Sequence, residues 1–478
     1  MRAVGLRILS GAFYGLEVHT RMPFRYGIAT MTCLPHVFLR LEAEVDGQVC
    51  TGLAADHLPP KWFTKDPAQP FAAEVAQMQQ VLFQALRTAV GLSGPSAFAL
   101  WQQLDAAQRA WGAAQGLPPL LVQFGVSMVE RALLDAVCRA RKQPLWALLR
   151  LGALGLDLGA VHPELAGLSP AELLPARPLA QLTLRHTVGL ADPLADAEIA
   201  PTARCQDGLP QSLLACIARY GLRHFKIKVS GDPDADLERL ERLAALLEAH
   251  APPDYAFSLD GNEQFASVEA FRAFWERLQA RPRLRPWLSR LLFVEQPLHR
   301  DVALAPAVAE AFRAWPQRPP VIIDESDATC DSLPTALRLG YAGTSHKNCK
   351  GVCKSIANAC LLAWRRRRQP APPLLLSGED LTTIGPVSLL QDLAVCALLG
   401  IASVERNGHH YFAGLSMMPP PVQAQVLAAH PDLYQRSAQG WPTLRLEAGR
   451  LAVSSVNAAP FGYGFDLDVT GFSPLASA

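Results

Sequence analysis

The hydrophobic and polar positions follow different patterns in the first and second parts of the chain. Residues 37–45 alternate apolar and polar side chains and lead into Asp46-Gly47, a pattern that predicts a strand entering a hairpin turn. From Phe71 to Leu149 the apolar residues recur at helical spacing. Residues 1–150 are therefore predicted to form an α+β domain.

A second pattern begins near Leu182, in which short apolar strands alternate with amphipathic helices. One such helix is expected at residues 234–249, where leucines recur every three or four positions. Eight parallel strands close a barrel whose interior is filled by side chains, so residues 181–415 are predicted to form a β/α barrel. The strands are expected at residues 182–188, 223–229, 255–260, 290–295, 320–324, 341–346, 373–377 and 402–405.

Two further segments complete the chain. Residues 151–180 are rich in Gly, Leu, Ala and Pro and are interpreted as a connector or insertion. Residues 416–478 are expected to return to the first domain, with a strand-like stretch at residues 444–453.

Composition narrows the class of protein. With 478 residues, of which 50% are hydrophobic, the chain can bury a barrel and an added domain. A net charge of +1 gives no electrostatic reason to expect nucleic acid or an anionic membrane as a partner. No stretch is long and apolar enough for a membrane span or a secretory signal, and the ten cysteines lack metal-finger spacing, so a cytoplasmic protein with buried thiols is expected.

Three acids occupy the ends of consecutive predicted strands: Asp260, Glu295 and Asp324. They recur at a spacing of roughly 30 residues, the length of one strand-helix unit. Because the carboxyl ends of barrel strands converge on one mouth, where active sites of this fold lie, the three carboxylates should meet there. Three carboxylates in register predict a site for a hard cation.

Lysines flank this set of acids in sequence. Lys226 and Lys228 lie two residues apart in one strand, so both should face the barrel interior, and Lys347 follows the sixth strand. Neighbouring cations disfavour protonation, and a lysine here is expected to have its pKa lowered towards neutrality, where it can act as a base.

The motifs in order resemble the enolase superfamily, and within it the muconate-lactonizing-enzyme-like branch, the mandelate racemase/muconate lactonizing enzyme family. They are Lys226-Ile227-Lys228, Asp260-Gly261-Asn262, Val294-Glu295-Gln296-Pro297, Asp324-Glu325-Ser326 and Lys347 with Lys350-Gly351. The resemblance implies a modified TIM barrel of seven helices and eight strands, with an α+β capping domain formed from the N-terminal region and the C-terminal segment.

Carried over by position, the resemblance assigns roles to individual residues. Asp260, Glu295 and Asp324 are expected to bind Mg²⁺, with Mn²⁺ as an alternative, and Lys228 and Lys347 to be the catalytic acid/base pair. The expected substrate contacts are Lys226, Asn262, Tyr26 and Glu379, and Glu325 and Lys350 are expected to support the ligands from behind.

The reaction implied is α-proton abstraction from a small-molecule carboxylate through an enediolate, as in a racemase or epimerase. A dehydratase, a cycloisomerase or an o-succinylbenzoate-synthase-like lyase would use the same residues, and a Schiff-base aldolase or a non-catalytic relative is a more distant alternative. Residues 403–407 lack the Asp-x-Asp of dipeptide epimerases, and Arg406, His409 and His410 could contact a substrate. A homo-oligomer is expected from the resemblance alone.

Overall fold

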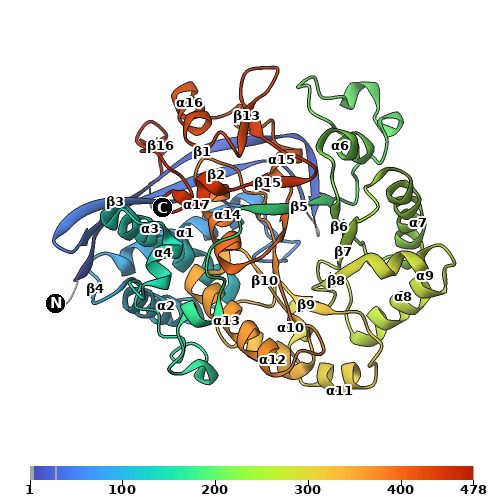
Figure 1. The fold of residues 1–478 in the computed structure, drawn as a ribbon, viewed down its shortest axis with the longest axis horizontal. Helices are drawn as coiled ribbons and strands as arrows, with labels where there is room; N and C mark the ends of the chain where they lie inside the picture. The colour runs from blue at the N-terminus through green and yellow to red at the C-terminus, as the bar shows by residue number, and fades with distance from the viewer. Residues whose placement is uncertain (1–4, 27–28, 477–478) are drawn as a thin grey trace.

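The structure, a computed structural model, describes residues 5–26 and 29–476 and contains a closed barrel of parallel strands (Figure 1). Each strand pairs with the next along the chain, and the last pairs with the first. The strands are β5 (Gln181–Val188), β6 (His224–Lys228), β7 (Ala256–Asp260), β8 (Leu291–Glu295), β9 (Val321–Ile323), β10 (Gly343–His346), β11 (Leu375–Gly378) and β12 (Ser403–Arg406).

The predicted barrel is confirmed, since every expected strand is present with ends that differ by no more than about two residues, the usual uncertainty of a strand boundary. The seven connections between consecutive strands each carry at least one helix. These helices are α6 (Leu213–Tyr220), α7 (Pro233–His250), α8 (Val268–Ala280), α9 (Leu284–Trp287), α10 (Arg300–Ala303), α11 (Ala307–Arg313), α12 (Ser332–Leu339), α13 (Val352–Arg368) and α14 (Ser388–Leu399).

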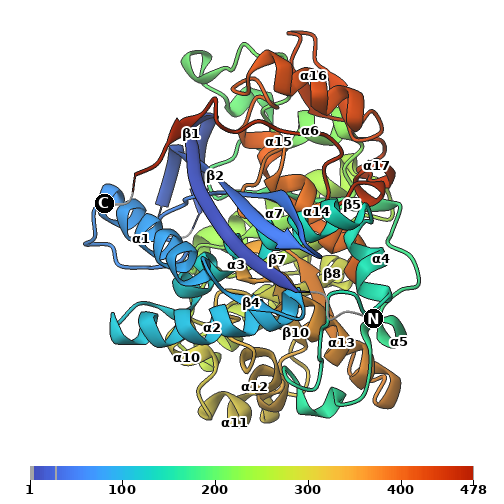
Figure 2. The same cartoon turned by 90° about the vertical axis from the view of Figure 1, so that its left-hand side faces the viewer.

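An antiparallel sheet and three long helices form the cap beside the barrel (Figure 1). Its main strands are β1 (Leu6–Tyr26), β2 (Ala29–Val45) and β3 (Gln48–His57), and a short β4 (Ser93–Gly94) pairs with β1. Figure 2 shows β1 and β2 running side by side, near α1 (Phe71–Ala89) and α2 (Ala97–Ala114). The third helix, α3 (Pro119–Arg141), contacts both β2 and β3.

Two contacts of α3 hold this helix against the sheet of the cap and against the barrel. A Cβ atom on Gly52 of β3 would lie 2.0 Å from the carbonyl oxygen of Ala132, so only glycine allows this close packing. Glu130 accepts hydrogen bonds from the backbone N–H groups of Val352 (2.8 Å) and Cys353 (2.7 Å), the first residues of α13. A carboxylate from the cap thereby accepts hydrogen bonds from the free backbone N–H groups at the N-terminus of a barrel helix.

The C-terminal segment contacts both parts of the molecule. Its elements are α15 (Gly408–Tyr411), α16 (Pro420–Ala429), β13 (Tyr434–Arg436), β14 (Pro442–Leu444), β15 (Arg450–Ala452), α17 (Ser454–Ala458) and β16 (Ser473–Pro474). Strand β16 pairs with β1 of the cap, whereas β15 pairs antiparallel with β5 of the barrel. Within the strand-like stretch expected at residues 444–453, residues 450–452 pair with the barrel strand β5 and not with the cap, whereas residues 473–474 pair with the cap strand β1.

The connector follows α4 (Leu145–Arg150) and contains a 3-10 turn (Pro163–Leu165) and the short helix α5 (Pro170–Leu173). The buried apolar residues of the cap and the barrel form one continuous core. Among the described residues, no helix has both the length and the apolar character needed to cross a membrane. All ten cysteines are free thiols.

Candidate active site

The three acids predicted to bind a cation lie on adjacent strands at one mouth of the barrel. Asp260 and Glu295 end β7 and β8 and are paired in register, and Asp324 directly follows β9. All three are at most 1% exposed. Parallel pairing therefore brings together residues that are far apart in sequence, as their positions at the strand ends predict.

Asp324 is held by two lysines. The Nζ atom of Lys347 lies 2.7 Å from its Oδ2, the Nζ atom of Lys350 lies 3.0 Å from its Oδ1, and the hydroxyl of Ser345 donates to Oδ1 as well. Burial raises the pKa of Asp324, but the charges of Lys347 and Lys350 outweigh this effect and hold the pKa well below its usual range. Lys350 thus contacts an expected metal ligand, and its role in supporting that ligand stays a prediction.

Lys226 lies among four carboxylates. Its Nζ atom is 3.0 Å from Asp260, 2.9 Å from Glu295, 2.8 Å from Glu379 and 2.9 Å from Glu405. Burial lowers the pKa of this lysine, but the four acids raise it well above its usual value. The role of Lys226 in holding a substrate carboxylate stays a prediction; its observed contacts join strands β6, β7, β8 and β12 and Glu379, the residue directly after β11.

Glu295 is surrounded by more negative charge than the nearby lysine neutralises. Burial, followed by the charges of Asp260 and Glu379, raises the pKa of Glu295 well above its usual value. Its Oε2 atom accepts no hydrogen bond from the described residues, although Lys226 lies within ion-pair distance of it. A buried carboxylate oxygen of this kind is suited to a cation ligand.

Lys228 contacts Asp260 and Asn262, with its Nζ atom 2.8 Å from Oδ2 of the aspartate and 2.6 Å from Oδ1 of the asparagine. Asn262 and the following Glu263 both have positive φ, 39° and 66°. Such a turn is strained for glutamate, and Arg300 and Lys65 hold its carboxylate in place. Since Lys65 belongs to the cap, this turn is fixed by both parts of the molecule.

Lys347 lies under an aromatic ring of the cap, with its Nζ atom 4.2 Å from the centroid of Trp62. Burial lowers the pKa of Lys347, but Asp324 more than compensates, and the net pKa is above the usual value for lysine. The prediction of a lowered pKa is therefore wrong for Lys347 in its observed ion pair. The charge of Asp324 raises the pKa by more than the charge of Lys226 lowers it.

The remaining predicted residues differ in their placement. Glu325 accepts a hydrogen bond from Nδ2 of Asn262 (3.2 Å), and burial, with the nearby charge of Asp324, raises its pKa to about 7. Glu379 is bonded to Arg185, Lys226 and Ser377 and does not line the cavity, so its surroundings disfavour substrate contact. Tyr26 ends β1, but its side chain lies outside the described part of the structure.

A cavity at the barrel mouth contains both proposed bases. Its wall is formed by Phe24, Pro59, Trp62, Lys226, Lys228, Asn262, Lys347, Asp380, Leu381, Thr382, Glu405 and Asn407. Sequence reasoning missed Trp62, whose position among prolines and a lysine in a loop resembles ordinary surface sequence. His409 and His410, suggested as substrate contacts, are not among the lining residues; His409 contacts His186 of β5, and His410 contacts Cys216 of α6.

Comparisons with known proteins identify the fold. No protein-family model matches the sequence, and no curated protein matches it. Solved structures match over almost the whole chain. A mandelate racemase/muconate lactonizing protein from Herpetosiphon aurantiacus is 17% identical, with a TM-score of 0.58 and coverage of 97% of this chain and 99% of that chain.

Two further structures are similar to the same extent. Muconate lactonizing enzyme from Pseudomonas fluorescens, complexed with muconolactone, is 17% identical (TM-score 0.59; 98% of this chain, 99% of that chain). Dipeptide epimerase from Cytophaga hutchinsonii, complexed with Mg and the dipeptide D-Ala-L-Val, is 15% identical (TM-score 0.57; 98% and 99%). The chain has the fold of the mandelate racemase/muconate lactonizing enzyme branch of the enolase superfamily.

Proposed function

We propose that this protein is an enzyme that removes the α-proton of a small-molecule carboxylate with the help of a bound divalent cation, and that it acts as a racemase or epimerase. The observation that carries the proposal is the position of Lys228 and Lys347 around the barrel. Lys228 ends β6 and Lys347 follows β10, and three strands separate β6 from β10 in either direction. Strands four apart in a closed eight-stranded barrel face each other across it.

The three acids occupy one side of the line that joins the two lysines. Asp260, Glu295 and Asp324 come from β7, β8 and β9, the strands between β6 and β10 on that side. A carboxylate substrate held on this side would place its α-carbon between the two amines. Amines on opposite faces of one carbon are what an exchange of configuration requires, since one removes a proton and the other donates one.

The donor set fits a hard divalent cation. Asp260, Glu295 and Asp324 would hold it through carboxylate oxygens, which suit Mg²⁺ and also Mn²⁺. The buried Glu295 oxygen without a hydrogen bond, and the raised pKa of Glu295, indicate that negative charge is in excess at this point. When bound, the cation would supply the positive charge that stabilises an enediolate.

The lysines and the proposed cation ligands are linked through their ion pairs. Lys228 is paired with Asp260 and Lys347 with Asp324, and the charge of Asp324 raises the pKa of Lys347. Only a neutral amine can accept a proton from carbon. Asp260 and Asp324 would each serve both as a cation ligand and as the partner of a proposed base, so a change at either aspartate would affect both functions.

The test is deuterium exchange. The purified protein, with Mg²⁺, is incubated in D₂O with a panel of carboxylic acids of known configuration, and α-deuterium uptake is measured by mass spectrometry. Once an exchanging acid is found, Lys228→Ala should exchange only the configuration facing Lys347, and Lys347→Ala only the opposite one. The lost exchange should fall by roughly 10² to 10⁴, the usual contribution of a general base.

A matched control is Lys354→Gln, because Lys354 is a buried lysine on α13 that pairs with Asp327 and does not line the cavity. It should leave both exchange rates unchanged. Exchange of both configurations at wild-type rates in either alanine variant would refute the two-base proposal. Release of a leaving group or ring closure, in place of inversion, would instead assign the same residues to a lyase or cycloisomerase.

A further inference from the structure

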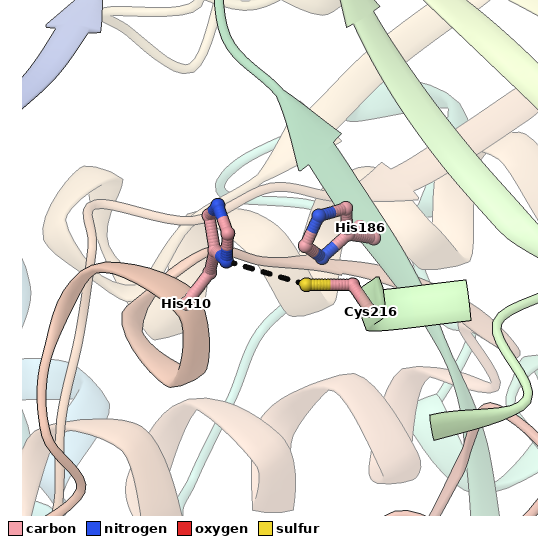
Figure 3. A group of neighbouring side chains, drawn as sticks. All are labelled: His186, Cys216 and His410. Carbon is pink, nitrogen blue, oxygen red and sulfur yellow. Dashed lines mark hydrogen bonds between the residues drawn. The ribbon is translucent and has the colours of Figure 1, made fainter. Parts of the chain in front are cut away.

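A second group of potential ligands lies outside the barrel. His186 of β5, Cys216 of α6 and His410 of α15 point towards one another in Figure 3. One ligand atom from each of the three lies within 4.8 Å of the others, and the side chains are at most 2% exposed. Three elements that are distant in sequence thus contribute two imidazoles and a thiol to one buried point.

This group is separate from the proposed active site. On β5, Arg185 bonds to Glu379 and Thr187 bonds to Glu405, so both side chains point into the barrel. Since alternate residues of a strand face opposite sides, His186 points outwards, towards the surrounding helices. The group therefore lies on the outer surface of the barrel wall.

The spacing is close to that of a tetrahedral zinc site. Zinc-sulfur and zinc-nitrogen bonds of about 2.3 and 2.05 Å at a tetrahedral angle place the two ligand atoms about 3.6 Å apart. The observed distance from Sγ of Cys216 to Nδ1 of His410 is 3.6 Å. The two remaining pairs lie within 4.8 Å. To reach the geometry of such a site, the nitrogen-nitrogen pair would need to close by at most about 1.5 Å and the nitrogen-sulfur pair by at most about 1.2 Å.

The surroundings of the group also suit a metal. Nδ1 of His186 lies 3.1 Å from Nε2 of His409, a contact that orients the ring as outer partners orient metal-binding histidines. Nδ1 of His409 is buried and has no hydrogen-bond partner among the described residues. The nearby Arg21 donates to the backbone oxygen of His410, and its charge is paired with Asp207.

We propose that His186, Cys216 and His410 bind a zinc ion, which joins β5, α6 and α15 on the outer surface of the barrel. Imidazole and thiolate ligands favour zinc over the hard cation that the carboxylate site would take, so the two sites would select different metals. Helix α15 follows Asn407, which lines the active-site cavity. The ion would thus stabilise a segment that supports one wall of that cavity.

The test uses Co²⁺ as a spectroscopic probe on the full-length protein after treatment with a chelator. The wild-type protein should take up one Co²⁺ that gives a thiolate-to-cobalt charge-transfer band, and Zn²⁺ should displace it. Cys216→Ser should abolish the band. His410→Gln should weaken binding by at least 10-fold, and His409→Ala, which removes only the outer partner, by about 10-fold.

Two control variants test whether the band arises from this group of ligands. Cys360→Ser changes a buried cysteine of α13 outside the group and should retain the band, and so should Glu295→Gln, which alters a ligand of the carboxylate site. Zinc should also raise the melting temperature of the wild type and of Cys360→Ser, but not of Cys216→Ser. Absence of the band in the wild type, or its persistence in Cys216→Ser, would overturn the proposal.

Discussion

Two of the proposed cation ligands should differ in how much stability they lose when the carboxylate is changed to an amide. Asp324 is the closest acid to Lys347 (2.7 Å) and to Lys350 (3.0 Å), and Lys350 is 1% exposed with its next acid 3.6 Å away. Asp324→Asn leaves these buried cations poorly paired. Breaking a buried pair typically costs about 3–5 kcal/mol, and the free energy of unfolding should fall by that amount.

Glu295→Gln should have little effect on stability in the absence of a cation. Glu295 shares Lys226 with three other acids, which remain at 2.8–3.0 Å after the substitution. The change also removes a negative charge that is repelled by Asp260 and Glu379. The lost contact and the relieved repulsion oppose each other, so the free energy of unfolding should change by less than about 1 kcal/mol, the size of an ordinary hydrogen bond.

Urea unfolding in the presence of EDTA measures both effects, and a second series with Mg²⁺ measures cation binding. Mg²⁺ at 100 times its dissociation constant should stabilise the wild type by about 2.7 kcal/mol and both variants by much less. Equal destabilisation of Asp324→Asn and Glu295→Gln in EDTA would refute the reasoning from ion pairs. Full stabilisation of Glu295→Gln by Mg²⁺ would refute its role as a ligand.

Three further predictions concern single residues. Glu130→Gln leaves one of the N–H groups of residues 352–353 without its acceptor and should lower the free energy of unfolding by about 1–3 kcal/mol, measured with urea. Trp62→Leu removes a contact of about 1 kcal/mol that stabilises the ammonium form of Lys347, so the neutral base should form more readily and exchange on that lysine's face should rise by up to about fivefold, with the other face unchanged. Burial lowers the pKa of His430 to about 4, so the unfolded chain takes up this proton first as the pH falls below 6.5. Stability should therefore decrease from pH 6.5 to pH 4, and His430→Gln should reduce the slope by up to about 1.4 kcal/mol per pH unit.

The barrel could be predicted from the sequence because its signals are local. Each strand is a short apolar run, and each acid follows such a run directly, so the alternation of strands and helices is enough to place Asp260, Glu295 and Asp324 at one mouth. The two-residue spacing of Lys226 and Lys228 likewise indicates that they share a face. These inferences need only the order of residues along one element.

The features that the sequence does not reveal depend on contacts between distant elements. The ring of Trp62 reaches Lys347 only because the cap closes over the barrel mouth. The pairing of β15 with β5 follows from the path of the chain after the barrel, and a three-residue strand carries almost no pattern. The position of Lys226 in its strand predicts that it faces the interior, but only the closure of the barrel surrounds it with four acids.

The position of Lys226 limits how this site can change during evolution. One amino group balances acids contributed by strands on both halves of the barrel, so replacing any of those acids alters the charge felt by the rest. Replacement of Lys226 by a neutral residue would leave four buried carboxylates without their shared counter-charge. New specificity is therefore expected to arise first in positions that do not touch this lysine, such as the cavity residues Phe24 and Leu381, while the five charged groups change only in compensating pairs.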